Sequence, residues 1–365
     1  MQIKAAVIRS KGGPFIVEDV ELDEPRDDEI LVKVVAAGMC HSDLNTRDQN
    51  YPPKPPVVVG HEGAGVVEAV GRKVSAVKPG DRVVLTYNSC EQCFSCQAGK
   101  PWACEKLFEL HFGGYAPDGR MTIRDRSGPI ASGYFGQSSF ATYALAYENN
   151  CVKVPAGAPL ELAGPLGCGI QTGAGAVLNA LQPPAGETIV IFGAGSVGLS
   201  AVMGAVIAGA GQIIAVDVKP GRLELAGQLG ATAVVNAATS DPLDELKRLT
   251  GGGVRYVLEA SGAPRSLGCG IKLLKTGGML GLVGAPPIGT EIPLDVNFMI
   301  FNRTIRGIVQ GYSDRHTFIP RLLELHRAGR FPFDKLIRHY DFKDINQAAL
   351  DSDSGVTIKP VLRME

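Results

Sequence analysis

The sequence has few aromatic residues, almost no net charge and no long apolar run. Tryptophan occurs once, and aromatic residues make up 6% of the chain. The 36 lysines and arginines balance 37 aspartates and glutamates, so the formal net charge of −1 gives no global attraction to nucleic acid or to anionic lipid. With 45% hydrophobic and 20% charged residues, the composition excludes a disordered chain and predicts a soluble globular protein.

The longest stretch with almost no charge, 197–216, is interrupted by glycines at 204, 209 and 211. It is better explained as a buried helix followed by a strand than as a membrane span of about 20 apolar residues. Residues 1–9 lack the apolar core and the cleavage site of a secretory signal peptide. We therefore expect a cytoplasmic protein that does not enter a membrane, in a compartment where clustered cysteines hold metal more often than they form disulfides.

The pattern of apolar residues changes along the 365-residue chain, whose length fits two domains. Before residue 150, short alternating segments are separated by proline, glycine and aspartate, which predicts β-strands. From about residue 188, apolar runs alternate with helical patterns, which is typical of a doubly wound parallel sheet in an α/β fold. The expected strands of that sheet are 188–192, 213–217, 233–236, 255–260 and 279–284.

Four of the eight cysteines fall within 15 residues of one another; they are Cys90, Cys93, Cys96 and Cys104. Four thiolates complete the tetrahedral shell of a zinc ion and leave no position for water or substrate, so such a zinc is structural. Two local disulfides are an alternative, which the two-residue gaps and the expected compartment disfavour. A zinc module that binds nucleic acid is another alternative, but the acidic and basic residues of this segment balance.

Three further residues, Cys40, His61 and Cys168, can supply two thiolates and one imidazole. This set leaves the fourth tetrahedral position free, which is how catalytic zinc is held. Each residue also has an ordinary explanation, since Cys168 can be a small buried residue and His61 a satisfied core histidine. Their spacings of 21 and 107 positions cannot by themselves bring the three together, so these residues alone leave the question open.

A glycine motif at 193–198 follows the expected strand 188–192 and begins a helix, and Asp217 ends the next strand. This context predicts a dinucleotide site, with the pyrophosphate at the N-terminus of the helix. Asp217 would accept hydrogen bonds from the adenosine ribose and repel a 2′-phosphate, which favours NAD over NADP. The expected cofactor contacts of the motif are Gly193, Gly195, Ser196, Val197 and Gly198.

The segment around His61 reads Gly60-His61-Glu62-x2-Gly65-x5-Gly71-x2-Val74. It resembles the signature of the zinc-dependent alcohol dehydrogenases of the medium-chain dehydrogenase/reductase superfamily. The Cys40 segment, the four cysteines and Cys168 lie where that family has them, and the resemblance covers nearly the whole chain. Segments 134–143, 164–173 and 331–335 are similar to the aryl-alcohol (benzyl alcohol) dehydrogenase branch in particular.

The resemblance implies a GroES-like β-rich catalytic domain at 1–169 and 310–365 and a Rossmann NAD-binding domain at 170–309. It implies two zinc ions per chain, one catalytic and one structural. It also places the last strands of the Rossmann domain around 295–307, where relatives pair across a twofold axis. A homodimer is therefore expected, with a tetramer as the alternative.

By the same resemblance, Cys40, His61 and Cys168 hold the catalytic zinc. Glu62 is expected just behind the metal, and Asp43 is expected to bind the other ring N–H of His61 and so fix its tautomer. The alternative for both acids is a solvated surface charge.

Ser42 occupies the position of the hydroxyl that relays the alcohol proton in relatives. Many relatives end this relay in a histidine, but here that position is Asn45, which cannot act as a base near pH 7. The relay is therefore expected to end in water or in His41, whose position faces the cofactor pyrophosphate in relatives. Arg222 is expected beside the ribose, although it could also offer a cation to a phosphate.

Tyr51, Tyr134 and Phe135 are expected to line the substrate pocket, with core packing as their alternative. Aromatic walls suit benzyl-type, cinnamyl or allylic terpene alcohols better than ethanol. The implied reaction is hydride transfer between an alcohol and NAD, in which zinc lowers the pKa of the hydroxyl or polarises the aldehyde carbonyl. A glutathione-dependent formaldehyde dehydrogenase, a geraniol-type dehydrogenase and a zinc-stabilised binding protein without catalysis are the competing interpretations.

The remaining cysteines and histidines have no expected role. Cys151 and Cys269 lie among apolar neighbours, which predicts inert core residues. The expected surface or loop histidines are His111, His316, His326 and His339.

Overall fold

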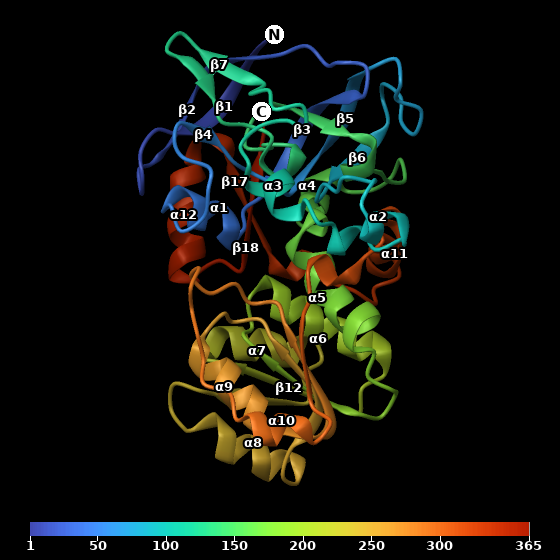
Figure 1. Cartoon of the computed structure of the whole chain (residues 1–365), viewed down its shortest axis with the longest axis vertical. Helices are drawn as coiled ribbons and strands as arrows, with labels where there is room; N and C mark the ends of the chain where they lie inside the picture. The colour runs from blue at the N-terminus through green and yellow to red at the C-terminus, as the bar shows by residue number, and fades with distance from the viewer. Residues whose placement is uncertain (365) are drawn as a thin grey trace. The chain divides into compact units, whose positions relative to one another are not determined.

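The computed structural model describes residues 1–364, which fall into two compact units. Unit 1 comprises Met1–Cys168, Asp314–Glu324 and Asp334–Glu365, and unit 2 comprises Gly169–Ser313 and Leu325–Phe333. Both the first and the last segments of the chain belong to unit 1, as the blue and red ribbon in Figure 1 shows. The domain ranges expected from the resemblance, 1–169 with 310–365 and 170–309, stay a prediction.

Unit 1 is built around two β-sheets, as the alternating segments before residue 150 predict. Its strands are β1 (Gln2–Ile8), β2 (Phe15–Leu22), β3 (Glu29–Gly38), β4 (Val57–Val58), β5 (Gly63–Val70), β6 (Arg82–Leu85), β7 (Ile123–Asp125), β8 (Gly128–Ile130), β9 (Tyr143–Tyr147), β10 (Cys151–Lys153), β17 (Ile337–Asp341) and β18 (Lys359–Arg363). One sheet has the order β4-β1-β2-β7-β8, and the other has the order β10-β6-β5-β3-β18-β17 with β9 paired to β3.

The helices of unit 1 are short and lie between these strands. They are α1 (His41–Arg47), α2 (Phe94–Gln97), α3 (Leu107–Phe112), α4 (Leu160–Ala163), most of α11 (Arg315–Arg327) and α12 (Ile345–Ser354). Strand β3 lies at the centre of the larger sheet, where it pairs with β5, β9 and β18. Because β3 leads directly into α1, the centre of the sheet fixes where that helix begins.

Unit 2 is a six-stranded parallel sheet in the order β13-β12-β11-β14-β15-β16, which confirms the predicted doubly wound α/β fold. Its strands are β11 (Thr188–Phe192), β12 (Gln212–Asp217), β13 (Ala233–Asn236), β14 (Val254–Glu259), β15 (Leu274–Leu282) and β16 (Thr304–Gly307). Its helices are α5 (Gly169–Gly175), α6 (Ser196–Ala208), α7 (Pro220–Gln228), α8 (Pro242–Thr250), α9 (Pro264–Lys272) and α10 (Val296–Ile300), several of which are labelled around β12 in Figure 1.

Burial explains the composition of this sheet. The run Ile189–Phe192 of β11 is buried, because a parallel sheet between helices is covered on both faces. The nearly uncharged stretch 197–216 is the buried helix α6 followed by β12, as expected from its glycines. Among residues 1–364, no helix has both the length and the apolar character that crossing a membrane requires.

One expected strand region is partly helical. Residues 295–307 were expected to hold the last strands, but only Thr304–Gly307 forms a strand, and Val296–Ile300 is the helix α10. The Asp295 carboxylate accepts a hydrogen bond of 3.0 Å from the Phe298 backbone N–H, and an aspartate in this position initiates a helix. This N-terminal cap explains why the segment folds as a helix before the strand.

Candidate functional site

The four clustered cysteines lie in one loop of unit 1 and converge on one point. Their sulfur atoms are all within 4.8 Å of one another, and Cys90 Sγ lies 4.0 Å from Cys96 Sγ. A tetrahedral zinc site with bonds of about 2.3 Å has sulfur–sulfur edges of about 3.8 Å. None of the eight cysteines forms a disulfide, so the two local disulfides considered above do not occur in this structure.

Backbone N–H groups of the same loop point at the sulfur atoms. The Cys93 N–H donates to Cys90 Sγ, and the Cys90 N–H donates to Cys104 Sγ, each over 3.3 Å. Such hydrogen bonds stabilise thiolates, which are the form that binds zinc. The loop therefore fits a zinc ion closed on all sides by sulfur.

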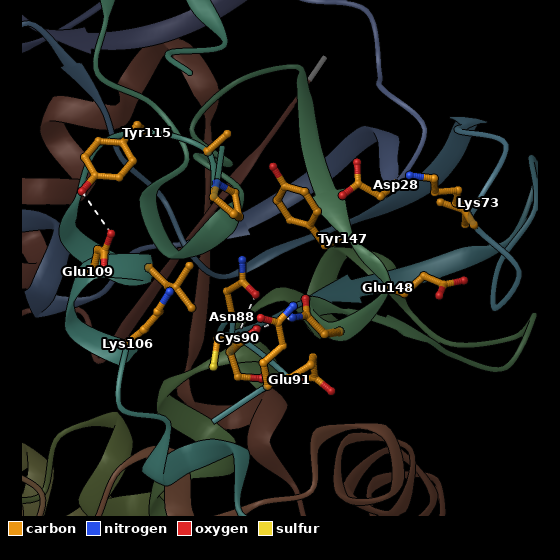
Figure 2. Close-up of a pocket in the computed structure, with 17 residues that line it drawn as sticks. Asp28, Lys73, Asn88, Cys90, Glu91, Lys106, Glu109, Tyr115, Tyr147 and Glu148 are labelled. Carbon is orange, nitrogen blue, oxygen red and sulfur yellow. Dashed lines mark hydrogen bonds between the residues drawn. The ribbon is translucent and has the colours of Figure 1, made fainter. Parts of the chain in front are cut away.

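A cavity of about 440 Å³ lies beside this loop, with Cys90 at its edge (Figure 2). Its walls carry charges of both signs, including Lys73, Glu91 and Glu148. Tyr51, Tyr134 and Phe135, the residues expected to line the substrate pocket, are not among its lining residues.

The structure also brings together the three scattered ligand candidates, and Glu62 with them. One ligand atom from each of Cys40, His61, Glu62 and Cys168 lies within 4.8 Å of the others. Cys40 directly precedes α1, His61 lies between β4 and β5, and Cys168 follows the turn 164–167. Three segments far apart in sequence are therefore united by the folding of unit 1.

The His61 ring is fixed at one nitrogen and free at the other. Its Nδ1 lies 3.0 Å from Asp43 Oδ1, and both side chains are fully buried. Its Nε2 is buried and has no hydrogen-bond partner among the described residues. A buried imidazole nitrogen without a partner, beside two thiols, is the donor set of a zinc site with an open position.

Asp43 also ties the ligand segments together. Its Oδ1 accepts from the Gly60 N–H over 3.0 Å, and its Oδ2 accepts from the Cys40 N–H over 2.9 Å. Burial opposes a positive charge on His61, but the Asp43 carboxylate and Cys40 together raise the pKa of His61 to about 10. A metal ion that binds Nε2 must therefore displace a proton. The expectation that Asp43 binds the ring of His61 is confirmed by this geometry.

The thiols of this cluster are unequal. A hydrogen bond with Cys168 holds the pKa of Cys40 well below its ordinary value, against the effect of burial, and the Lys359 charge acts in the same direction. The same hydrogen bond and burial raise the pKa of Cys168.

Lys359 is the partner of Glu62, and no local pattern in the sequence indicates it. Its Nζ donates to Glu62 Oε1 over 2.9 Å, to Oε2 over 3.0 Å and to the Met39 carbonyl over 2.9 Å. Burial lowers the pKa of Lys359, but the charge and hydrogen bond of Glu62, together with the charges of Cys40 and Cys168, raise it above its ordinary value. Glu62 and Asp43 are both fully buried, so neither is the solvated surface charge considered above.

The relay candidates lie on α1. Ser42 Oγ is 3.9 Å from Cys40 Sγ, in the first turn of the helix. Asn45 accepts a hydrogen bond of 3.3 Å from Asn50, and His41 is exposed at the start of α1. These positions leave water and His41 as the two candidate ends of the relay.

The expected pocket aromatics pack against the residues of this site. The Tyr134 hydroxyl donates to the Ser42 carbonyl over 3.0 Å. The Phe135 ring stacks on the His61 ring, with centroids 4.3 Å apart. Both aromatic side chains belong to the buried core cluster of unit 1, whereas Tyr51 is half-buried.

His111 was expected on the surface or in a loop, and this prediction was wrong, because the residue lies in α3 and is buried. The side chain is buried, because its ring stacks on the other face of Phe135 with centroids 4.1 Å apart. Its Nε2 lies 3.1 Å from the Asn88 carbonyl, and burial lowers the pKa of His111 to about 3. His316 is exposed, and His326 and His339 are half-buried, while Cys151 and Cys269 are buried as predicted.

The glycine motif forms a tight turn between β11 and α6 in unit 2. Gly193 has a φ of +88°, and a Cβ on Gly198 would lie 1.7 Å from the Gly193 carbonyl oxygen. A Cβ on Gly195 would meet no atom within 4 Å, so this side of the turn is open for the approach of a ligand. The turn leads into α6 at Ser196 and Val197, whose helix N-terminus suits a pyrophosphate.

Asp217 ends β12 beside this turn. Its Oδ2 accepts from the Ala194 N–H over 2.7 Å, and its Oδ1 accepts from the Lys219 N–H over 2.9 Å. Each oxygen keeps a second lone pair for a ribose hydroxyl. Arg222 lies in the first turn of α7, and its Nε is buried without a hydrogen-bond partner among the described residues.

Comparison with known proteins agrees with this geometry. The chain matches the family model of the zinc-binding dehydrogenases over residues 196–326 and that of the alcohol dehydrogenase GroES-like domain over residues 26–156. It is 45% identical to a geraniol dehydrogenase of Castellaniella defragrans, over 98% of this chain and 97% of the relative.

Two solved structures are similar over the whole length. An alcohol dehydrogenase zinc-binding domain protein from Burkholderia ambifaria has a TM-score of 0.97 and 54% identity, covering 100% of this chain and 99% of the other. A benzyl alcohol dehydrogenase from Acinetobacter calcoaceticus has a TM-score of 0.96 and 47% identity, covering 100% of both chains. Similarity at this level along the whole chain shows that it belongs to the zinc-dependent alcohol dehydrogenases of the medium-chain dehydrogenase/reductase superfamily.

Proposed function

We propose that the protein is an NAD-dependent alcohol dehydrogenase that reversibly oxidises aryl or allylic primary alcohols, of the benzyl alcohol type, to aldehydes. The observation that carries this proposal is the convergence of Cys40, His61 and Cys168, with the buried and unpartnered Nε2 of His61. When bound there, a zinc ion supplies a Lewis acid that lowers the pKa of an alcohol hydroxyl, and NAD accepts the hydride.

The side chains of unit 1 have separate tasks in this proposal. Cys40, His61 and Cys168 hold the metal, and Asp43 keeps the His61 ring in the binding orientation. Ser42, in the first turn of α1, takes the proton of the alcohol and passes it to water or to His41.

The four cysteines Cys90, Cys93, Cys96 and Cys104 hold a second zinc ion, so that each chain binds two. Because sulfur closes this site on all sides, it stabilises its loop and has no position for an alcohol. The hydrogen bonds from backbone N–H groups of the same loop support this assignment.

The nucleotide site belongs to unit 2 and selects NAD. Asp217 is held beside the glycine turn by two backbone N–H groups, so its carboxylate remains where a 2′-phosphate would be repelled. Arg222, with its unpartnered Nε, lies beside the adenosine ribose in this proposal.

The substrate class is supported by what two relatives act on. Geraniol and benzyl alcohol are both primary alcohols whose hydroxyl-bearing carbon is attached to an unsaturated carbon. Tyr134 and Phe135, close to His61, offer aromatic edges to such a molecule. The geraniol-type substrate remains the second candidate, because the geraniol dehydrogenase is 45% identical to this chain.

Initial rates with four alcohols and two cofactors test the proposal. Benzyl alcohol, geraniol, ethanol and hydroxymethylglutathione are compared with NAD and with NADP, alongside the zinc content per chain. We expect two zinc ions, a preference for NAD, and kcat/KM for benzyl alcohol above that for geraniol and far above that for ethanol. A higher kcat/KM for geraniol would favour the second candidate, and one zinc with no turnover would contradict both.

We also propose that unit 2 forms a homodimer through its last strand. Strand β16 is at the edge of the sheet and has one unpaired side. Exposed apolar side chains gather nearby in the sequence, at Ile288, Leu294, Val296, Ile300 and Phe301. Sedimentation should show a wild-type particle with the mass of two chains and a Phe301→Glu particle with the mass of one. A wild-type particle with the mass of four chains would favour a tetramer, and one with the mass of a single chain would contradict the proposal.

A further inference from the structure

Three aromatic rings are stacked in unit 1, and the central one is Phe135. Its ring lies 4.3 Å from the His61 ring at an interplanar angle of 22°, and 4.1 Å from the His111 ring at 16°. All three side chains are buried. Both faces of Phe135 are therefore covered by imidazole rings, which leaves only its edge for any other contact.

This stack restrains a motion of His61 that the hydrogen bond to Asp43 leaves free. The bond at Nδ1 fixes one point in the plane of the ring, but the ring can still tilt about that point. Phe135 covers one face of the ring, and the Tyr134 ring meets it edge-on with centroids 5.6 Å apart. Tilting His61 would push it into these neighbours, so the direction of Nε2 depends on them.

The backing of Phe135 is itself held in place. His111 donates from Nε2 to the Asn88 carbonyl over 3.1 Å, which fixes the outer ring of the stack. Phe135 has a φ of +53°, a left-handed conformation that is uncommon for a bulky residue and is retained only where the surroundings enforce it. Asn150 Nδ2 donates to the carbonyls of Phe135 and Gly136, over 3.2 Å and 3.1 Å, and supports this turn.

We propose that Phe135 is a positioning residue that holds the plane of His61 for metal binding, and that His111 acts through Phe135. This inference rests on the proposed function only in taking the ion to be zinc. Removing the Phe135 ring lets His61 tilt, so the metal site becomes less regular and releases its ion faster. Replacing the His111 ring with an aliphatic side chain has the same effect to a smaller degree, because Phe135 then loses its backing.

The test uses the full-length protein with zinc exchanged for cobalt(II), whose visible absorption reports the geometry of its ligands. Spectra and the rate of cobalt transfer to a chelator are measured without alcohol or NAD. Cobalt can bind at both clusters. The absorption bands that disappear in His61→Ala belong to cobalt held by Cys40, His61 and Cys168. Phe135→Leu removes the stacking ring, and Phe342→Leu is the matched control, since Phe342 is buried in the same core cluster with no ring contact to His61.

We expect Phe135→Leu to shift these bands and to speed cobalt release by up to about 10- to 100-fold, since loss of a hydrogen-bonded partner of a metal ligand lowers metal affinity by that factor. Phe342→Leu should leave both unchanged even where it lowers thermal stability. His111→Leu should follow Phe135→Leu in direction, and His111→Phe, which keeps a ring, should recover the wild-type spectrum.

The proposal would be overturned if Phe135→Leu kept the absorption bands and the cobalt release rate of wild-type protein. It would also be overturned if Phe342→Leu changed both as much as Phe135→Leu does. If Phe135→Leu does not fold, the pair His111→Leu and His111→Phe decides the question in the same way. If wild-type protein oxidises no alcohol, the proposed function fails, while the cobalt measurements still decide the role of Phe135.

Discussion

The two metal-ligand clusters of unit 1 differ in how their members are brought together. The four cysteines lie within Cys90–Cys104, and three of them are half-exposed. Cys40, His61 and Cys168 come from three distant segments, and the His61 ring is fully buried. The first cluster is assembled by one loop, and the second by the fold of the whole unit.

The two clusters also differ in which groups contact their ligand residues. Backbone N–H groups of the loop itself stabilise the sulfur atoms of the four-cysteine cluster. At the second cluster the contacts come from side chains: Asp43 and Phe135 contact the His61 ring, and Lys359 pairs with Glu62. The hydrogen bonds to sulfur at the first cluster therefore come from its own loop, whereas the contacts that hold His61 and Glu62 come from other side chains.

The largest expected effect separates the two clusters directly. His61→Ala should abolish alcohol oxidation and reduce the zinc content from two ions per chain to one, because the open site loses a ligand. Cys93→Ser should also lose one zinc, but the protein that remains folded should keep most of its kcat. Metal analysis and initial rates on the same samples check both. If His61→Ala and Cys93→Ser both stayed folded and lost activity equally, the two clusters would not differ in function as proposed.

Next in size is the effect of removing Lys359. Lys359→Met leaves Glu62 buried without its cation, which should lower the free energy of unfolding by about 3–5 kcal/mol. Adding Glu62→Gln to this variant should restore part of the loss, because the buried carboxylate charge is gone. Urea unfolding of the single and double variants measures these changes. A loss below about 1 kcal/mol in Lys359→Met would mean that the ion pair is not what supports the cluster.

Asp43→Asn should have a smaller effect, confined to the second cluster. Loss of the carboxylate partner of a metal-binding histidine typically lowers metal affinity or activity about 10- to 100-fold. Asp48→Asn is the control, since Asp48 directly follows the same helix and pairs with Arg47 instead. Zinc affinity by competition with a chelator, together with kcat/KM, should fall in the first variant only. Equal values for Asp43→Asn and wild type would show that the His61 ring needs no such partner.

The smallest expected effect concerns a contact between Arg315 and the start of the four-cysteine loop. Arg315 Nη2 donates to Ser89 Oγ and to Glu91 Oε1, each over 2.9 Å, and its guanidinium lies 4.6 Å from the centre of the Tyr87 ring. Arg315→Lys should lower stability by about 1–2 kcal/mol through the lost hydrogen bond and ring contact. Zinc release from the four cysteines should become faster while kcat stays unchanged. If kcat fell instead, the loop would contribute to the chemistry.

The sequence predicted those parts of the fold and site that depend on local patterns. The spacing of the four cysteines, the glycine motif and the apolar runs of unit 2 each correspond to one short segment. Periodicity therefore located strands such as β11 and β12, and ligand spacing located the four-cysteine loop. The α10 helix was missed because its signal, the cap by Asp295, is a single residue within a segment expected to be strands.

Contacts between distant segments could not be predicted in this way. Lys359 pairs with Glu62 from almost 300 positions further along the chain, and nothing near Lys359 distinguishes it from a surface lysine. His111 was expected on the surface or in a loop because the sequence shows no metal-like partner for it, yet its ring stacks on Phe135 from a distant segment and is buried. Cys40, His61 and Cys168 were grouped as one ligand set because of the family resemblance. Their spacing in the sequence could not have grouped them.

The most direct test of the central claim compares wild-type protein with Cys168→Ser for zinc content and for NADH formation from benzyl alcohol. Wild-type protein should carry two zinc ions per chain and form NADH, and Cys168→Ser should keep its fold and one zinc ion but form NADH at a small fraction of the rate. Undiminished NADH formation by Cys168→Ser, or none by wild-type protein with both zinc ions bound, would contradict the account.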